Sequence, residues 1–433
     1  MPRRLGKLLS SLLLATLAAC AGTAGPAQPH PTDLQAGERA SGGINAAVHR
    51  KKPYILLISF DGFRPDYLDK FDLPNFRRAM QLGARARALI PVFPSLTFPN
   101  HYSLVTGLYP DRHGIVANSF YDPARNQTYS LSDRKAVTDG TWYGGEPIWV
   151  TAERQGMVAG MFFWPGSEAP IQGVRPTYWK DFDAATPNVE RVNGVLEWLR
   201  LPDERRPHML TLYFNEPDST SHRFPLDAPE IERAAQSVDR ALGMLMDGIA
   251  TLPIKDRVYL VLTSDHGMVE TGANHTVRLD ALIDTGLIQV GFGGPVANLY
   301  VNGNRDVAEQ LRDRLNQRVV HGKAYLRSEL PKHYRYSSPR AGDVVVVMNE
   351  SWTLATSPPS PRPIARWGMH GWDPALTSMH ALFIVSGPGV RAGSTVGEVR
   401  NVDVYHFMTE QLGLKPAPNL DGEPRRIGRS VMK

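Results

Sequence analysis

Carboxylate and imidazole side chains follow three apolar runs of this sequence, close to the point where each run ends. The runs are YILLISF (54–60), HMLTLYF (208–214) and RVYLVLT (257–263). The residues that follow them are Asp61, Asp218, His222, Asp265 and His266. In open α/β sheets, ligands bind beyond the carboxyl ends of the strands. We therefore expect these five side chains to lie close together at one edge of a sheet.

Two spacings favour a shared site. Asp218 and His222 are four residues apart, so a helical turn would place both side chains on the same face. The adjacent pair 265–266 precedes Gly267, which allows the backbone to bend so that both side chains converge. Each feature also has a purely structural explanation, because Asp61 before a glycine is typical of a turn and Asp218 is a suitable helix cap.

Three crowded carboxylates repel one another, so we expect a cation between them. Oxygen and nitrogen ligands without sulfur suit zinc best, and manganese and iron also accept such a set. Five ligands exceed the three that a catalytic zinc ion usually keeps, so we predict two ions about 3.5–4 Å apart, as in many enzymes that act on phosphorus. A further ligand is needed, and spacing alone leaves His370 and His380 as alternatives.

Four hydroxyl side chains in the segment 92–114 are candidate nucleophiles: Ser95, Thr97, Ser103 and Thr106. Thr97 occupies the expected N-cap of a helix, with Pro99 in the first turn. Capping alone would explain a threonine here, at about 1 kcal/mol. The start of a helix also favours anions, and a metal ion can ionise a hydroxyl. Thr97 is therefore the predicted nucleophile, whereas Ser103 and Thr106 lie further inside the helix.

Strand-like apolar runs alternate with helical patterns along most of the chain. Further apolar runs lie at 157–164 and 381–387. Such alternation predicts an α/β fold with a mainly parallel central sheet and helices on both faces. Shorter strand-like pieces and an amphipathic helix interrupt the pattern at 278–340. We predict a catalytic α/β core at 51–277 and 341–433, with a smaller α+β subdomain inserted between them.

The first twenty residues have a basic start, an apolar run and small residues before Cys20, the only cysteine of the sequence. The run is too short to span a bilayer, so we predict a signal peptide at 1–20. Leu17-Ala18-Ala19-Cys20 resembles a bacterial lipobox, which predicts a periplasmic lipoprotein anchored to the membrane through Cys20. An ordinary signal with a chance cysteine is the alternative. Residues 21–50 are rich in Ala, Gly, Pro and Thr, typical of a flexible tether.

The composition excludes some classes of partner. The 433 residues carry a formal net charge of +5, and removal of residues 1–20, which hold three basic and no acidic side chains, leaves +2. So small a charge does not indicate binding to a nucleic-acid duplex or direct binding to a membrane surface. We predict no protein partner.

Five motifs resemble those of the nucleotide pyrophosphatase/phosphodiesterase family, which belongs to the alkaline phosphatase superfamily. The motifs are FDGFRPDYL (60–68), FPSLTFPNHYSLVTGLYPDRHGIVAN (93–118), EPDSTSH (216–222), TSDHGM (263–268) and GMHGWD (368–373). They appear in the order found in the family, and the resemblance extends from Tyr54 to the C-terminus. Together with the predicted signal peptide, the resemblance implies a secreted bacterial member of the family.

The resemblance implies two zinc ions and a covalent phosphothreonine intermediate. The residues that match the ligands of one zinc ion are Asp61, Thr97, Asp265 and His266. The residues that match the ligands of the other are Asp218, His222 and His370. His370 is thereby favoured over His380.

The resemblance also implies a nucleotide-binding pocket. Asn118 matches a residue that helps to hold a non-bridging phosphate oxygen. Phe98 and Tyr213 match positions that sandwich a nucleobase, and Phe182 falls where the family often has another aromatic side chain. The implied reaction is hydrolysis of a phosphodiester or pyrophosphate bond in a small-molecule nucleotide, with release of a nucleoside 5′-monophosphate.

The chain departs from the family beside His222. The family usually has glycine before this histidine and Gly-Pro after it, whereas this chain has Ser221 and then Phe224-Pro225. This difference affects the expected substrate more than the chemistry. Alternatives on the same site are a phosphomonoesterase, a phosphonoacetate hydrolase, and a lipid or choline phosphodiesterase. A secreted zinc-binding protein without catalysis is the alternative from another class, whereas a sulfatase would need a Cys/Ser-x-Pro-x-Arg motif that Thr97-Phe98-Pro99 does not provide.

Overall fold

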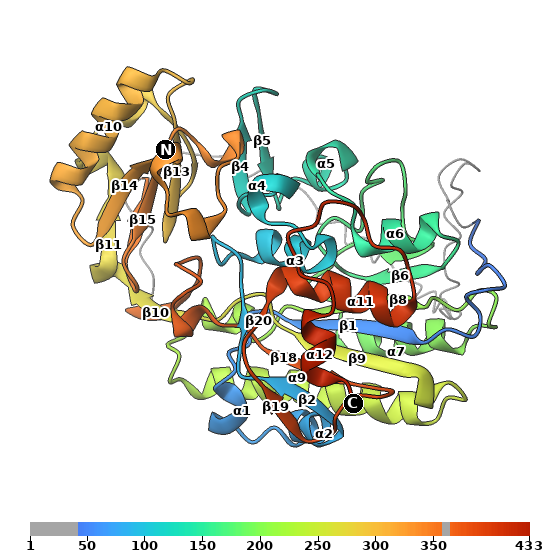
Figure 1. Ribbon diagram of the computed structural model, residues 1–433. Coiled ribbons are helices and arrows are strands. Elements are labelled where there is room, and N and C mark those ends of the chain that lie inside the picture. The colour runs from blue at the N-terminus through green and yellow to red at the C-terminus, as the bar shows by residue number, and fades with distance from the viewer. Residues whose placement is uncertain (1–41, 357–363) are drawn as a thin grey trace, which may run out of the picture. The chain divides into compact units, whose positions relative to one another are not determined.

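The structure is a computed structural model that describes residues 42–356 and 364–433 (Figure 1). Its main sheet has eight strands in the order β19-β2-β18-β9-β1-β8-β6-β7. Their bounds are β1 (Tyr54–Phe60), β2 (Gly83–Ala86), β6 (Ala159–Phe162), β7 (Tyr178–Lys180), β8 (Met209–Phe214), β9 (Val258–Thr263), β18 (Phe383–Ser386) and β19 (Ser394–Val396). Every strand except β18 runs in the same direction, so the prediction of a mainly parallel sheet is confirmed.

Strand β18 comes from an apolar run that looks like the parallel strands in the sequence. It pairs antiparallel with both β9 and β2. Apolar composition reports that a strand is covered on both faces, not the direction in which it runs. The sheet is therefore mixed at this position.

Helices cover both faces of the sheet, because successive side chains of a buried strand point to opposite faces. Ile55 and Leu57 of β1 pack in one core with α3 (Thr97–Thr106), α6 (Ile148–Arg154) and α11 (Val404–Leu412). Leu56 and Ile58 pack in a second core with α2 (Pro74–Leu82), α7 (Asn188–Arg200) and α9 (Pro229–Ala250). Figure 1 shows these two helical layers on either side of β1 and β9. This arrangement places the carboxyl ends of the central strands beside the start of α3.

A second, four-stranded antiparallel sheet carries its own small core. Its order is β12-β13-β15-β14, with α10 (Arg305–Arg318) packed on it. The strands are β12 (Gln289–Phe292), β13 (Val296–Tyr300), β14 (Gly322–Leu326) and β15 (Val344–Met348). Strand β15 lies beyond residue 340, so this sheet extends past the expected end of the insertion. Strongly apolar β15 looks like a strand of the main sheet, but its partners are β13 and β14.

The remaining helices and strands are short and form connections and hairpins. They are α1 (Tyr67–Lys70), β3 (Leu89–Ile90), α4 (Pro110–His113), β4 (Ser119–Asp122), β5 (Gln127–Ser130), α5 (Arg134–Val137), α8 (Asp218–Ser221), β10 (Val269–Gly272), β11 (Thr276–Arg278), β16 (Thr353–Ala355), β17 (Arg366–Met369), β20 (Val399–Arg400) and α12 (Arg426–Val431). Among the residues described, no helix combines the length and apolar character needed to cross a membrane.

The segment just before β1 packs against the core, although its composition resembles a tether. Asn45 is buried, and its side-chain Nδ2 donates to the carbonyl oxygens of Asp203 and Arg206 at 3.0 and 2.7 Å. Its Oδ1 accepts from the backbone N–H of Val158 at 2.8 Å. One polar side chain that satisfies buried backbone groups leaves no periodic signal in the sequence. The expected signal peptide and Cys20 lie outside the described residues.

Candidate active site

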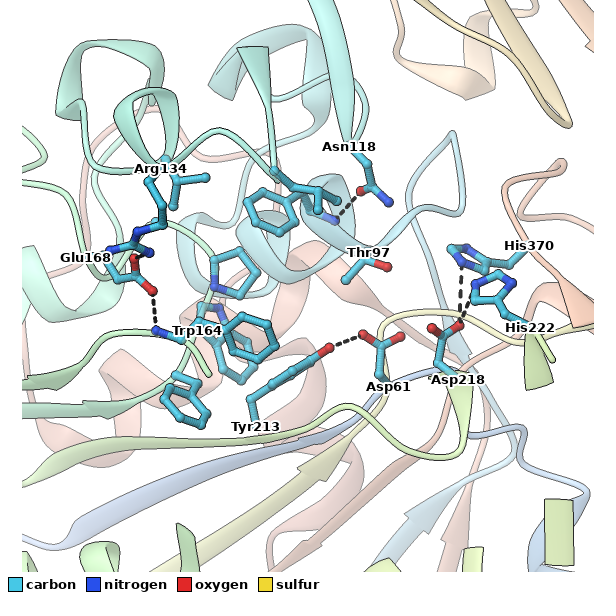
Figure 2. Close-up of a pocket in the computed structure, with 17 residues that line it drawn as sticks. Asp61, Thr97, Asn118, Arg134, Trp164, Glu168, Tyr213, Asp218, His222 and His370 are labelled. Atoms are coloured by element: carbon cyan, nitrogen blue, oxygen red, sulfur yellow. Dashed lines mark hydrogen bonds and ion pairs between the residues drawn. The ribbon is translucent and has the colours of Figure 1, made fainter. Parts of the chain in front are cut away.

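The predicted carboxylates, imidazoles and Thr97 meet beyond the carboxyl ends of the central strands, and Figure 2 shows those that line the adjoining pocket. They come from the end of β1 (Asp61), the first residue of α3 (Thr97), both ends of α8 (Asp218 and His222), the loop after β9 (Asp265 and His266) and the residue after β17 (His370). Segments far apart in the sequence therefore supply one site.

The loop after β9 is shaped by a close approach of two backbones. A Cβ atom added to Gly267 would lie 2.0 Å from the carbonyl oxygen of Ser378. Only glycine fits there. Gly267 is therefore required by the close approach of another backbone, and not by a left-handed backbone conformation.

The buried imidazole of His266 faces two carboxylates. Its Nε2 lies 3.0 Å from Asp265 Oδ2 and 3.5 Å from Asp61 Oδ1. All three side chains are at most 2% exposed. Charges buried to this extent are unfavourable unless they compensate one another.

Asp218 faces the other two imidazoles. Its Oδ1 lies 3.3 Å from His222 Nε2 and 3.5 Å from His370 Nε2. The ring of His370 stacks on that of His266, with centroids 3.5 Å apart, which joins both sets into one centre. Two groups have ligand atoms within 4.8 Å of one another: Asp218, His266 and His370, and Asp61, His101 and Asp265.

The hydrogen bonds of the three histidines fit metal binding. Nδ1 of His222, His266 and His370 lies 2.8–3.0 Å from a backbone carbonyl oxygen, of Gly368, Gly267 and Ser95 respectively. A carbonyl oxygen only accepts, so each Nδ1 carries the hydrogen and each Nε2 presents a lone pair to the carboxylates. This arrangement is typical of metal-binding histidines.

The carboxylates present matching acceptors. The buried oxygens Asp61 Oδ1 and Asp218 Oδ1 have no hydrogen-bond donor among the described residues, and Asp265 Oδ2 has only the long contact of 3.3 Å with His101 Nδ1. Lone pairs of oxygen and nitrogen thus face each other across 3.0–3.5 Å, which is unfavourable unless a cation or proton lies between them. The donor set of oxygen and imidazole nitrogen suits zinc.

The pKa values of Asp61 and Asp218 shift in opposite directions, because the two carboxylates have different charged neighbours. Burial, together with the charges of Asp265 and Asp218, raises the pKa of Asp61 well above its usual value. Burial opposes ionisation of Asp218 as well, but His222 and His370 lower its pKa to about 2. The carboxylate of Asp61 is thus the least stable charge of the cluster in the absence of a cation.

Thr97 is the only one of the four hydroxyl candidates that faces an imidazole of the candidate site. Helix α3 begins at Thr97, whose side chain caps no backbone group, so the expected N-cap role is not observed. Its Oγ1 lies 3.4 Å from His266 Nε2. The other three hydroxyls bond elsewhere: Ser95 to the Trp372 carbonyl, Ser103 to His113 and Thr106 to the Tyr102 carbonyl.

The residue that competed with His370 lies outside the centre. His380 is half-buried, and burial lowers the pKa of its ring. It belongs to neither group of candidate metal ligands.

An aromatic pocket of about 310 Å³ opens beside Thr97. Its aromatic lining consists of Phe98, Phe163, Trp164, Phe182 and Tyr213. The Tyr213 hydroxyl donates to Asp61 Oδ2 at 2.6 Å, so this side chain serves both the pocket and the carboxylate cluster. Phe182 is 47% exposed at the rim.

Asn118 lines the same pocket. Its Oδ1 accepts from the backbone N–H of Phe98 at 2.9 Å. The carbonyl side of the amide is therefore used by the protein, and the Nδ2 group is the side that can donate to a ligand.

Sequence reasoning missed the far end of the pocket. Arg134 pairs there with Glu168, whose Oε1 also accepts from the backbone N–H of Phe182 at 2.7 Å. Figure 2 shows this pair across the pocket from His222 and His370. Trp164 and Glu168 follow β6, so the rule that ligands bind beyond strand ends would have found them. No local signal marks Arg134.

The fold and this site define a known class of protein. A family model described as type I phosphodiesterase/nucleotide pyrophosphatase matches residues 55–373. The chain therefore belongs to that family.

Particular relatives agree with this assignment. Human ectonucleotide pyrophosphatase/phosphodiesterase family member 1 is 40% identical over 380 residues, which cover 85% of this chain and 40% of the human protein. Venom phosphodiesterase CdcPDE of Crotalus durissus collilineatus is 36% identical over 391 residues, which cover 88% and 47%. The chain thus spans less than half the length of these relatives.

Solved structures confirm the alkaline-phosphatase-like α/β fold. Murine ectonucleotide pyrophosphatase/phosphodiesterase 5 superposes with a TM-score of 0.82 at 30% identity, covering 87% of this chain and 100% of that chain. An inactive variant of the murine protein in complex with AMP has the same score and identity, with 88% and 100% covered.

Proposed function

We propose that this protein hydrolyses phosphodiester or pyrophosphate bonds of nucleotides and releases nucleoside 5′-monophosphates through a phosphothreonine on Thr97. The observation that carries the proposal is the position of the Thr97 hydroxyl. It lies between the carboxylate cluster and an aromatic pocket, 3.4 Å from His266 Nε2.

The residues fall into two sets that would each hold a zinc ion. Asp61, Asp265 and His266 would hold one ion together with Thr97. Asp218, His222 and His370 would hold the other. When bound, the two ions would lower the pKa of the threonine hydroxyl and offset charge on the attacking and leaving oxygens.

The side chains of the protein would orient the nucleophile and the substrate. The first turn of α3 places Thr97 Oγ1 beside the pocket, where it would face the phosphorus of a bound substrate and the attack would be effectively intramolecular. Asn118 Nδ2 would donate to a non-bridging oxygen, where it stabilises charge that grows in the transition state.

The pocket favours a diester with an aromatic group. Stacking of a base on an aromatic side chain contributes about 1–3 kcal/mol in single-stranded nucleic-acid sites, and Phe98, Tyr213 and Phe182 offer such surfaces. Of the described residues that line the pocket, Arg134 is the one lysine or arginine, and its charge is shared with Glu168. A phosphate monoester, with two negative charges, finds no free cationic side chain there. The complex of the murine relative with AMP supports a nucleotide ligand.

The test is a comparison of two substrates with zinc-loaded protein. We expect kcat/KM for the p-nitrophenyl ester of thymidine 5′-monophosphate to exceed that for p-nitrophenyl phosphate by a factor of about 100 or more, which is the effect of about 3 kcal/mol in the transition state. A preference for the monoester would overturn the substrate class. Absence of turnover with zinc bound would support a binding protein instead.

We further propose a periplasmic lipoprotein anchored through Cys20. The sequence before Cys20 supports this proposal, as do the names of relatives that are ecto-enzymes or venom components. A Cys20→Ser variant should move from the membrane to the soluble fraction after lysis, whereas equal distribution of both proteins would exclude a lipid anchor.

A further inference from the structure

His101 lies one helical turn after Thr97 and is fully buried beneath the site. Its Nδ1 is 2.9 Å from the carbonyl oxygen of Thr97 and 3.3 Å from Asp265 Oδ2. Its Nε2 is 2.8 Å from Ser59 Oγ, at the end of β1. One ring therefore contacts the segments that carry the proposed nucleophile, one of its carboxylates and the central strand.

The partners determine which ring nitrogen carries the hydrogen. The carbonyl oxygen of Thr97 only accepts, so Nδ1 of His101 carries the hydrogen and donates it to this oxygen at 2.9 Å. The same N–H faces Asp265 Oδ2 at the longer distance of 3.3 Å, where it attracts the carboxylate. The hydroxyl of Ser59 then donates to Nε2. Both nitrogens are thus used within the protein, and His101 is not available as a metal ligand, although it lies within 4.8 Å of two carboxylates.

His266 provides the contrast, because its Nδ1 is used by the backbone and its Nε2 faces the carboxylates and Thr97 Oγ1. Two neighbouring histidines therefore have different tasks. His266 presents a lone pair to the centre, whereas His101 presents a donor to the groups around it.

The ring of His101 has little freedom. It lies edge-to-face against Trp164 and Tyr213, with centroid distances of 5.0 and 5.3 Å. The indole N–H of Trp164 also donates to the His101 carbonyl at 3.0 Å. The other oxygen of Asp265, Oδ1, accepts from Gly62 N–H at 3.1 Å, so this carboxylate is held from two sides.

We propose that His101 is a positioning residue whose Nδ1–H couples the first turn of α3 to Asp265. It fixes the Thr97 hydroxyl relative to the carboxylate that would hold its metal ion. This inference rests on the proposed function. A residue that orients ligands from behind typically changes metal affinity or activity about 10- to 100-fold when it is replaced.

Three substitutions at His101 separate its two nitrogens. Asparagine places an amide near the position of Nδ1, so His101→Asn keeps the donor to Thr97 and Asp265. Glutamine places its amide near Nε2, so His101→Gln keeps the contact with Ser59 and loses that donor. His101→Phe keeps a ring and loses both.

His113 supplies a matched control. It is also buried, and its two nitrogens contact Ser103 Oγ at 2.9 Å and the Ile115 N–H at 3.2 Å. It contacts none of the proposed metal ligands. His113→Phe therefore removes two buried hydrogen bonds of a histidine without touching the centre.

The experiment measures zinc dissociation constants by competition with a chelating dye, and kcat and KM for the nucleotide ester at saturating zinc. We expect His101→Asn to stay within about threefold of wild type. His101→Gln and His101→Phe should bind zinc more weakly and lose kcat, each about 10- to 100-fold, with KM little changed. His113→Phe should lower Tm and leave kcat and zinc affinity unchanged.

Equal zinc affinity and kcat in the Asn and Gln variants would overturn the inference, and so would a loss of kcat in His113→Phe as large as in His101→Phe. If wild type binds zinc but does not cleave the ester, the proposed function fails, and the order of zinc affinities still decides the role of His101. A wild-type protein that binds no zinc would overturn both proposals.

Discussion

The chemistry of each side chain in this site depends on which of its polar atoms are not already used in hydrogen bonds within the protein. The Nδ1–H groups of three histidines bind carbonyl oxygens, which directs each Nε2 to the carboxylates. Tyr213 donates to one oxygen of Asp61, and the other oxygen has no donor in the part of the chain that the structure describes. Residue identity alone would permit many other arrangements, so the hydrogen-bond partner of each group decides its chemistry.

Replacement of Thr97 tests the nucleophile. Thr97→Ala should lower kcat by about 10³-fold or more, as loss of a nucleophile does in covalent catalysis, because no other candidate hydroxyl faces the centre. Thr97→Ser should retain measurable turnover. Trapping of phosphoprotein by acid quench checks the intermediate, and full activity of the alanine variant would exclude it.

Replacement of Tyr213 and of Phe98 should distinguish orientation of the metal ligands from stacking of the base. Tyr213→Phe keeps the ring but removes the 2.6 Å hydrogen bond to Asp61, so we expect weaker zinc binding and a kcat lower by about tenfold, with KM little changed. Phe98→Ala should instead raise KM for the nucleotide ester about 5- to 150-fold, the effect of 1–3 kcal/mol of stacking. Steady-state kinetics at saturating zinc distinguish the two, and identical effects would contradict separate roles.

At the scale of elements, strand ends and helix starts bring the site together. Asp61 and the pair 265–266 leave the adjacent strands β1 and β9, and α3 starts beside them. Short helix α4 ends at His113, whose buried ring fixes Ser103 of α3. This contact joins α4 to α3 outside the pocket, whose lining includes neither His113 nor Ser103.

The burial of His113 predicts a loss of stability in acid. Burial lowers the pKa of its ring to about 3, below the usual 6.5. Between these values the unfolded chain binds one more proton than the folded chain, so the free energy of unfolding falls as the pH falls, by up to about 1.4 kcal/mol per pH unit. His113→Gln should show a shallower decline between pH 6.5 and 4 in urea titrations. An unchanged slope would show that other groups dominate.

At the scale of the whole molecule, the carboxylates that suit a cation also lower the folding stability of the metal-free protein. The pKa of Asp61 is raised because burial and two neighbouring carboxylates disfavour its charge. At neutral pH this charge lowers the stability of the metal-free protein, and a bound cation removes the penalty. Binding to the folded state then stabilises it, by about 2.7 kcal/mol when free zinc is 100 times its dissociation constant.

The effect of Asp61→Asn on Tm should therefore have opposite signs without and with bound metal. Without metal the variant should have a higher Tm than wild type at pH 7–8, because a buried, repelled charge is removed. With excess zinc, wild type should be the more stable protein. Thermal unfolding with chelator and with zinc gives both comparisons, and a variant that is less stable in both conditions would contradict the account.

The sequence by itself determined the class of fold, and it predicted the strand-end carboxylates and imidazoles and Thr97 as site residues. Apolar runs report burial, and parallel strands bring their ends to one edge, so residues after such runs must meet there. Only the tertiary structure decided the direction of β18, the partners of β15, the packing of Asn45, the contacts of His101 and the pairing of Arg134 with Glu168. These features depend on contacts between distant segments, on hydrogen-bond partners and on close backbone approach, none of which has a period or spacing along the chain.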